Sequence, residues 1–191
     1  ITPAEDAAYL AAVESGDIRG AMRMVNEEAR ERGIPYQGVN INDSGDARYT
    51  DLILSGKKTV ETRDSARNAF SELNAGERIG IVRTGVGEAM LVGYATVGEE
   101  KVYNTKEEFD SDFDSHRVSG GKFGFKNIKY GYPLLDVEKI DPIPVPKVKG
   151  EPIIKRRPII EPIVRDQQGN VIPLSQRFDE REESILRAAP T

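Results

Sequence analysis

The chain has 191 residues, a mass of 21.1 kDa and a formal net charge of −5 at pH 7. This length accommodates one ordinary domain with additional segments, and the acidic balance argues against broad, non-specific nucleic-acid binding, which requires a positive field. The chain contains no cysteine, which excludes disulfides, thiol catalysis and cysteine-based zinc sites. No apolar run reaches the roughly 18 residues of a membrane span. We therefore expect a cytoplasmic protein with no membrane partner.

Residues 1–35 are predicted to form a helical hairpin. Thr2, Pro3 and Glu5 match a capping box with proline at the first helical position, and Asp17 can cap a second helix. The segment resembles a helical spacer of large multidomain proteins from bacteriophages and mobile elements. Because the chain also does not begin with methionine, we expect it to be a piece of such a protein, flanked by further domains.

Residues 36–145 are predicted to form a small mixed β-barrel with short helices, an α+β fold. Short alternating runs recur at a spacing of roughly ten residues with glycine turns between them, which is typical of small barrels. Gly93 is expected to mark a bulge or a barrel corner. The expected elements are strands at 39–41, 58–63, 77–82, 89–97, 123–125 and 130–140, and helices at 49–55 and 106–113.

Residues 146–191 are predicted to be a proline-rich extended tail or linker. Eight of the 11 prolines lie between positions 142 and 190. Proline at this density excludes central strands and long helices, so we expect little regular structure there.

The most informative stretch is the corner at residues 52–64. It begins as an apolar helical turn, breaks at Gly56 and continues as an alternating run that carries Lys58, Glu61 and Arg63. A structural interpretation is a solvated strand edge, in which Glu61 pairs on the surface with one of the two cations. A functional interpretation is a charged cleft at the point where the helix ends and the strand begins.

The corner motif L-I-L-S-G-K-K-T-V-E-T-R, residues 52–63, resembles the signature of the ASCH domain, a branch of the PUA-like β-barrels. The expected continuation L-x-x-G-E-R-I-G-I-V follows at residues 73–82, with a glycine-rich hairpin after it. The resemblance covers residues 36–145. It implies a PUA-like barrel whose corner lines a cleft for RNA or nucleotide binding.

The resemblance and the residue types predict an RNA or modified-nucleoside binding site. Lys58 and Arg63 would hold a phosphate or a base edge, Glu61 would accept hydrogen bonds from an exocyclic amine, and tyrosines would stack on a base. The candidate binding residues are Lys57, Lys58, Glu61, Arg63, Asp64, Tyr49, Tyr130 and Tyr132.

Two other functions remain open. Some ASCH relatives resemble an acetylcytidine amidohydrolase with a Lys-x-x-Thr corner. Here Lys58 matches the lysine, but Glu61 replaces the hydroxyl nucleophile. Lys58 and Glu61 are then candidate catalytic residues of a hydrolase acting on RNA or acylated cytidine, with Glu61 as general base. The other possibility is a domain that binds no ligand and serves as a structural spacer within a phage polyprotein. A single histidine, His116, and the absence of ligand-spaced acids predict no metal and no cofactor.

Overall fold

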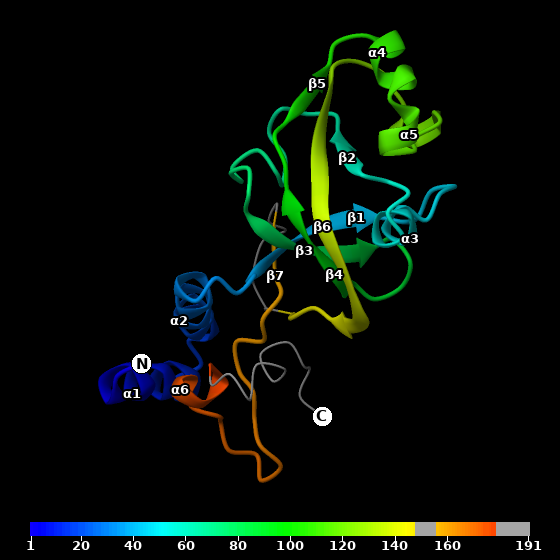
Figure 1. The fold of residues 1–191 in the computed structure, drawn as a ribbon. Coiled ribbons are helices and arrows are strands. Elements are labelled where there is room, and N and C mark those ends of the chain that lie inside the picture. The colour runs from blue at the N-terminus through cyan, green and yellow to red at the C-terminus, as the bar shows by residue number, and fades with distance from the viewer. Residues whose placement is uncertain (148–155, 179–191) are drawn as a thin grey trace. The chain divides into compact units, whose positions relative to one another are not determined.

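The computed structural model describes residues 1–147 and 156–178, which divide into two compact units (Figure 1). Unit 1 contains residues 1–38 and those from Ile143 onward, and unit 2 contains Val39–Pro142. Unit 2 lies within the range 36–145 in which the sequence predicts a barrel. The division of the chain into hairpin, barrel and tail at residues 35 and 145 stays a prediction.

Unit 1 begins with two helices, α1 (Pro3–Glu14) and α2 (Ile18–Glu31). The capping box is present: the Glu5 amide donates to Thr2 Oγ1 at 3.1 Å, and the Thr2 amide donates to Glu5 Oε1 at 3.0 Å. The Asp17 side chain accepts from the Gly20 amide and so caps α2. These caps satisfy amide groups that have no partner within their own helix.

The described part of the proline-rich segment has little regular structure but contributes to the core of unit 1. It contains β7 (Arg157–Pro158), which pairs with residues 37–38, and α6 (Leu174–Arg177). The Tyr9 hydroxyl donates to the Pro162 carbonyl at 2.5 Å. The buried apolar residues of the proline-rich segment between positions 156 and 178 are Ile159, Ile160, Val164, Leu174 and Phe178. The parts of the predicted tail at 148–155 and 179–191 lie outside the described residues.

Unit 2 is built on a curled sheet that forms a half-barrel and is accompanied by short helices (Figure 1), so the predicted α+β fold class is confirmed. The strands run in the order β2-β6-β4-β3-β1, and β5 pairs with β6. Their bounds are β1 (Gln37–Asn42), β2 (Val60–Arg63), β3 (Arg78–Thr84), β4 (Met90–Val97), β5 (Lys101–Tyr103) and β6 (Lys129–Pro144).

The antiparallel hairpin of β3 and β4 contains the expected irregularity at Gly93. Ile81 pairs with Gly93 and Val82 pairs with Leu91, so β4 has one extra residue at this point. A Cβ at Gly93 would lie 2.5 Å from the Glu138 carbonyl oxygen. Glycine therefore lets the backbone of β6 approach closely, and the bulge increases the curl of the sheet.

Short helices complete unit 2: α3 (Tyr49–Leu54), α4 (Lys106–Ser111), α5 (Phe113–His116) and the 3-10 turn η1 (Gly121–Phe123). The helix predicted at 106–113 is thus divided in two at Asp112. The strand predicted at 123–125 is wrong. Gly120 and Gly121 have φ values of 124° and 68°, which turn the chain into η1. Within the described residues, no helix is long and apolar enough to cross a membrane.

Candidate functional site

A cavity of about 370 Å³ lies in unit 2, lined in part by β1 and by the corner that leads into β2. A volume in this range is typical of small-molecule sites in proteins. Five of the expected site residues line it: Tyr49, Lys58, Glu61, Arg63 and Asp64. The corner at residues 52–64 therefore supplies part of the wall of the cavity.

The geometry of this wall follows from Gly56. Its φ of 80° lets α3 end abruptly, and the amides of Lys57 and Lys58 both donate to the Leu52 carbonyl at 2.9 Å. Because β2 begins only at Val60, Lys58 is not constrained by the alternation of the strand. Its side chain can therefore lie beside that of Glu61, three residues later.

Lys58 is a fully buried lysine, with 0% of its side chain exposed. Its Nζ donates to the His116 carbonyl at 2.5 Å and lies 3.5 Å from Glu61 Oε1. The ammonium also lies 4.8 Å from the centre of the Tyr49 ring, a cation–π distance. Burial lowers the pKa of Lys58, and the neighbouring Glu61 carboxylate partly opposes this effect.

Arg63 connects the two outer strands of the unit 2 sheet. From β2, its Nη2 donates to the Asn40 carbonyl of β1 at 2.8 Å and to Glu61 Oε2 at 3.0 Å. Its guanidinium also lies 5.2 Å from the centre of the Phe70 ring. Glu61 is thus held between two cations, Lys58 on one oxygen and Arg63 on the other.

A third cation of the cavity, Lys129, was missed by the sequence analysis. Its side chain is 2% exposed, and its Nζ lies 2.7 Å from Asp64 Oδ1 and donates to the Phe123 carbonyl at 2.7 Å. No sequence signal distinguishes Lys129, since a lysine at the start of a strand is usually exposed. The lining thus carries three cations, Lys58, Arg63 and Lys129, and two carboxylates, Glu61 and Asp64.

Aromatic and neutral polar side chains complete the lining. Tyr49 and Phe123 meet edge to face, with ring centres 5.9 Å apart. Burial, followed by the Glu61 charge, raises the pKa of Tyr49, so its hydroxyl remains protonated. Within the described structure, two buried polar atoms of the lining residues have no hydrogen-bond partner, Asn40 Oδ1 and Arg63 Nε. Such atoms are costly unless something else satisfies them.

Three of the expected site residues do not line the cavity. Lys57 is exposed, and its carbonyl accepts from Arg117 Nε. Tyr130 packs against the main core of unit 2. Tyr132 is buried, stacks on Phe70 at 4.7 Å and donates its hydroxyl hydrogen to Glu100 at 2.6 Å. These positions give the two tyrosines a packing role.

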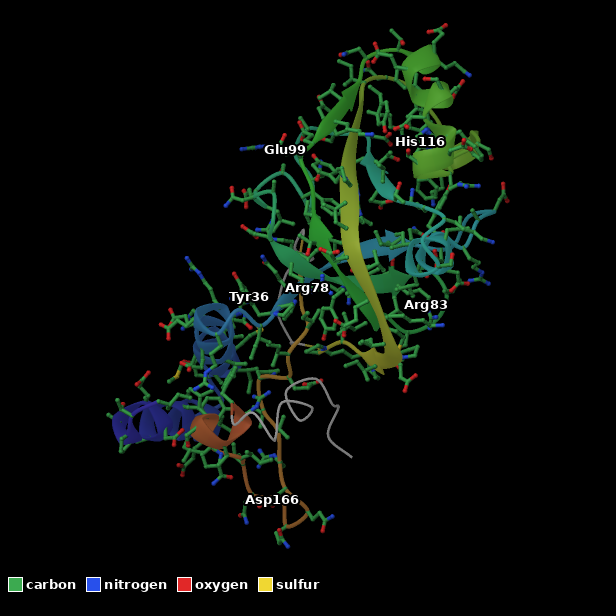
Figure 2. All side chains as sticks on the ribbon, in the orientation of Figure 1. Tyr36, Arg78, Arg83, Glu99, His116 and Asp166 are labelled. Atoms are coloured by element: carbon green, nitrogen blue, oxygen red, sulfur yellow. The ribbon has the colours of Figure 1, made fainter. Side chains whose placement is uncertain are left out.

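His116 is the buried last residue of α5 (Figure 2). Its Nδ1 accepts from the Val118 amide at 2.9 Å, so the hydrogen is on Nε2, which lies 2.6 Å from the Phe109 carbonyl oxygen. The ring stacks on Phe109 at 3.9 Å, and burial lowers the pKa of His116. Within the described residues, no group of three or more His, Asp or Glu residues is placed to hold a metal ion.

Among known proteins, solved structures are similar to this chain. No family model matches the sequence, and no curated protein matches it. The structural matches include ASCH from Zymomonas mobilis, together with its tyrosine-to-phenylalanine and serine-to-alanine mutants. Each is 20% identical to this chain with a TM-score of 0.46, covering 56% of this chain and 72–74% of the other. The structures found are ASCH domains, the family that the corner motif resembles.

Proposed function

We propose that the cavity of unit 2 binds the base of a nucleoside or of single-stranded RNA. Arg63 and Lys58 would contact the acceptor groups of the ligand, and Glu61 would accept from an exocyclic amine. The observation that carries this proposal is the convergence of Lys58, Glu61 and Arg63 on one cavity of ligand size. Tyr49 and Phe123 provide the aromatic surface on which a base could lie.

The energetics of the buried charges support a binding role. A buried ion pair is weak evidence for stability, because removing charges from water costs about as much as the pairing returns. The cavity also keeps a polar acceptor, Asn40 Oδ1, and a donor, Arg63 Nε, without partners in the described structure. A polar ligand that reorganises these side chains would satisfy groups that packing alone leaves unsatisfied.

Binding of the four ribonucleosides and of a short single-stranded RNA, measured by calorimetry on wild type and variants, tests the proposal. Arg63→Lys keeps the charge but loses the planar fork of donors, and we expect it to weaken binding by about tenfold, or roughly 1.4 kcal/mol. Arg67→Lys is the matched control, because Arg67 is exposed and is not among the lining residues. Melting temperatures measured in parallel separate loss of recognition from loss of folding.

The results distinguish three cases. Weaker binding by Arg63→Lys, at an unchanged melting temperature and with a normal control, supports recognition in the cavity. Parallel losses of binding and stability would mean that Arg63 serves the fold, and wild-type affinity in Arg63→Lys would remove it from the site. If folded wild-type protein binds none of the probes, the structural spacer is the remaining interpretation.

A hydrolase is the second candidate, favoured by the lowered pKa of Lys58. A lysine shifted in this direction next to a carboxylate is a common feature of catalytic sites. In this version Glu61 or Lys58 would take a proton from water, and Arg63 would stabilise the developing negative charge. Release of acetate from N4-acetylcytidine or cleavage of RNA, abolished by Glu61→Gln, would establish it. Absence of both reactions in a protein that binds nucleosides would reject it.

A further inference from the structure

One part of unit 2 has a charge opposite to that of the whole chain. Residues 115–135 contain Arg117, Lys122, Lys126 and Lys129 but no Asp or Glu, although the chain carries a net charge of −5. Lys129 is buried and paired with Asp64, as described above. The other three cations are exposed or partly exposed.

Two of these cations directly precede residues that line the cavity, and the third contacts one of the two. Arg117 precedes Val118 and donates from its Nε to the Lys57 carbonyl at 3.1 Å, which links it to the corner. Lys122 precedes Phe123, and its Nζ lies 5.3 Å from the centre of that ring. Lys126 donates from its Nζ to the Lys122 carbonyl at 3.2 Å.

We call Lys57, Arg117, Lys122 and Lys126 the basic rim. Lys57 is included because it precedes Lys58 in the lining. Among the ion pairs of the described residues, none involves a member of the basic rim. Among the described residues, Arg117 is one of two non-glycine residues with positive φ, at 63°, where it forms the C-cap of α5. This conformation is uncommon for a residue with a side chain.

We propose that the basic rim binds the phosphodiester backbone of a single-stranded nucleic acid whose base occupies the cavity. This inference rests on the proposed function of the cavity and specifies its ligand as a polymer rather than a free nucleoside. Exposed lysine and arginine side chains without carboxylate partners bind phosphates at little desolvation cost, and a groove of cations beside an aromatic surface is typical of single-strand binding. A free nucleoside carries no phosphate and would leave the rim unused.

The test compares wild type with the double variant Lys122→Ala/Lys126→Ala. The matched control is Lys106→Ala/Lys139→Ala, which removes the same charge from exposed positions of unit 2 that adjoin no lining residue. The probes are the ribonucleoside that wild type binds best, and single strands of about eight nucleotides in RNA and DNA form. Affinity is measured by fluorescence anisotropy or calorimetry at several salt concentrations.

We expect the double variant to bind the nucleoside like wild type but to bind the single strands more weakly. Loss of two phosphate contacts should also lower the salt dependence. Wild type should lose about sevenfold more affinity than the variant between about 50 and about 200 mM salt. The RNA and DNA arms show whether the sugar is also read.

Two results would overturn the inference separately from the proposed function. If nucleosides bind but the double variant and the control bind the single strands equally, the basic rim does not contact the backbone. If nucleosides bind but single strands bind no more tightly, the ligand is a free nucleoside. If neither nucleosides nor single strands bind folded wild type, the proposed function itself fails.

Discussion

At the scale of single residues, the main feature of the site is the cost of burying Lys58. Its ammonium has lost its water and contacts the His116 carbonyl, the Glu61 carboxylate and the Tyr49 ring in return. Burial lowers the pKa of Lys58, and the Glu61 carboxylate opposes this effect only in part. Burial of the Lys58 charge therefore costs free energy that an apolar side chain at the same position would not cost. Such unfavourable groups are common at functional sites.

A pH-dependent contribution to stability follows from Lys58. Between its lowered folded pKa and the ordinary value of 10.5, the unfolded chain binds more protons than the folded one, so the free energy of unfolding should rise with pH in this window. Urea unfolding of wild type and of Lys58→Met, between about pH 8 and about pH 10, isolates the effect. We expect the wild-type value minus the variant value to increase with pH. A difference that is constant or decreases would contradict the burial of the charged lysine.

His116 provides a second test, because it is the single histidine of the chain and gives one imidazole signal in NMR. Burial lowers its pKa, so the titration midpoint should lie below 6.5, and the ring should have its hydrogen on Nε2 at neutral pH. Since the folded pKa is below the unfolded one, His116 should reduce stability as the pH falls below 6.5. A midpoint at or above 6.5 would contradict the described packing against Phe109 and Val118.

At the scale of elements, the sequence predicted most of unit 2 because local signals are strong there. The break at Gly56, the alternation in β3 and the hairpin that follows each depend on residues close together in the chain. The error at 123–125 has the same origin: two phenylalanines alternate as in a strand, but the glycines before them turn the chain. Alternation alone carries no information on whether a partner strand is available.

The bulge in β4 leads to a prediction for Gly93. Alanine there places a Cβ 2.5 Å from the Glu138 carbonyl oxygen and 2.7 Å from Leu54 Cδ2, both in closely packed structure. We expect Gly93→Ala to lower the free energy of unfolding by about 1–3 kcal/mol, as overpacking does. Gly45→Ala is the control: its Cβ would lie 3.4 Å from Phe123, and the change should stay within about 0.5 kcal/mol. Equal effects would mean that β6 does not approach β4 as described.

The proline-rich segment leads to a prediction for unit 1. Ile160 is 0% exposed, so Ile160→Ala should destabilise this unit by about 2–5 kcal/mol, the usual cost of truncating a buried isoleucine. Amide hydrogen exchange in α1 and α2 should accelerate accordingly. Gln167→Ala, at an exposed position, should leave exchange unchanged. If the helices exchange equally slowly in both variants, the segment is a linker that does not stabilise the hairpin.

At the scale of the whole molecule, the cavity combines residues that are distant in sequence. The corner supplies Lys58, Glu61 and Arg63, which the sequence analysis selected, but Lys129 and Phe123 come from a segment some sixty residues later. To predict that Lys129 and Phe123 line the cavity, one must know that β6 and the loop before it lie next to the corner. The tyrosines illustrate the same point: Tyr130 and Tyr132 alternate with Lys129 and Gly131 along β6, and the alternation does not say which face meets the cavity.

At this scale, the charge of the proposed site also differs in sign from the net charge of the chain. The chain is acidic overall, whereas the lining of the cavity has three cations and two carboxylates. The segment 115–135, which supplies three residues of the basic rim, contains no Asp or Glu. Net charge therefore argues against general nucleic-acid binding without arguing against a local site. All residues of the proposed site belong to unit 2.

The most direct measurement of the central claim is an NMR titration of the isotope-labelled full chain with ribonucleosides and a short single-stranded RNA. The account predicts saturable shifts concentrated at the lining residues Asn40, Tyr49, Lys58, Glu61 and Arg63, with Lys122 and Lys126 responding only to RNA. Signals from α1 and α2 should remain unchanged. Saturable binding that leaves the lining residues unperturbed, or no shifts with any of these probes, would contradict the account.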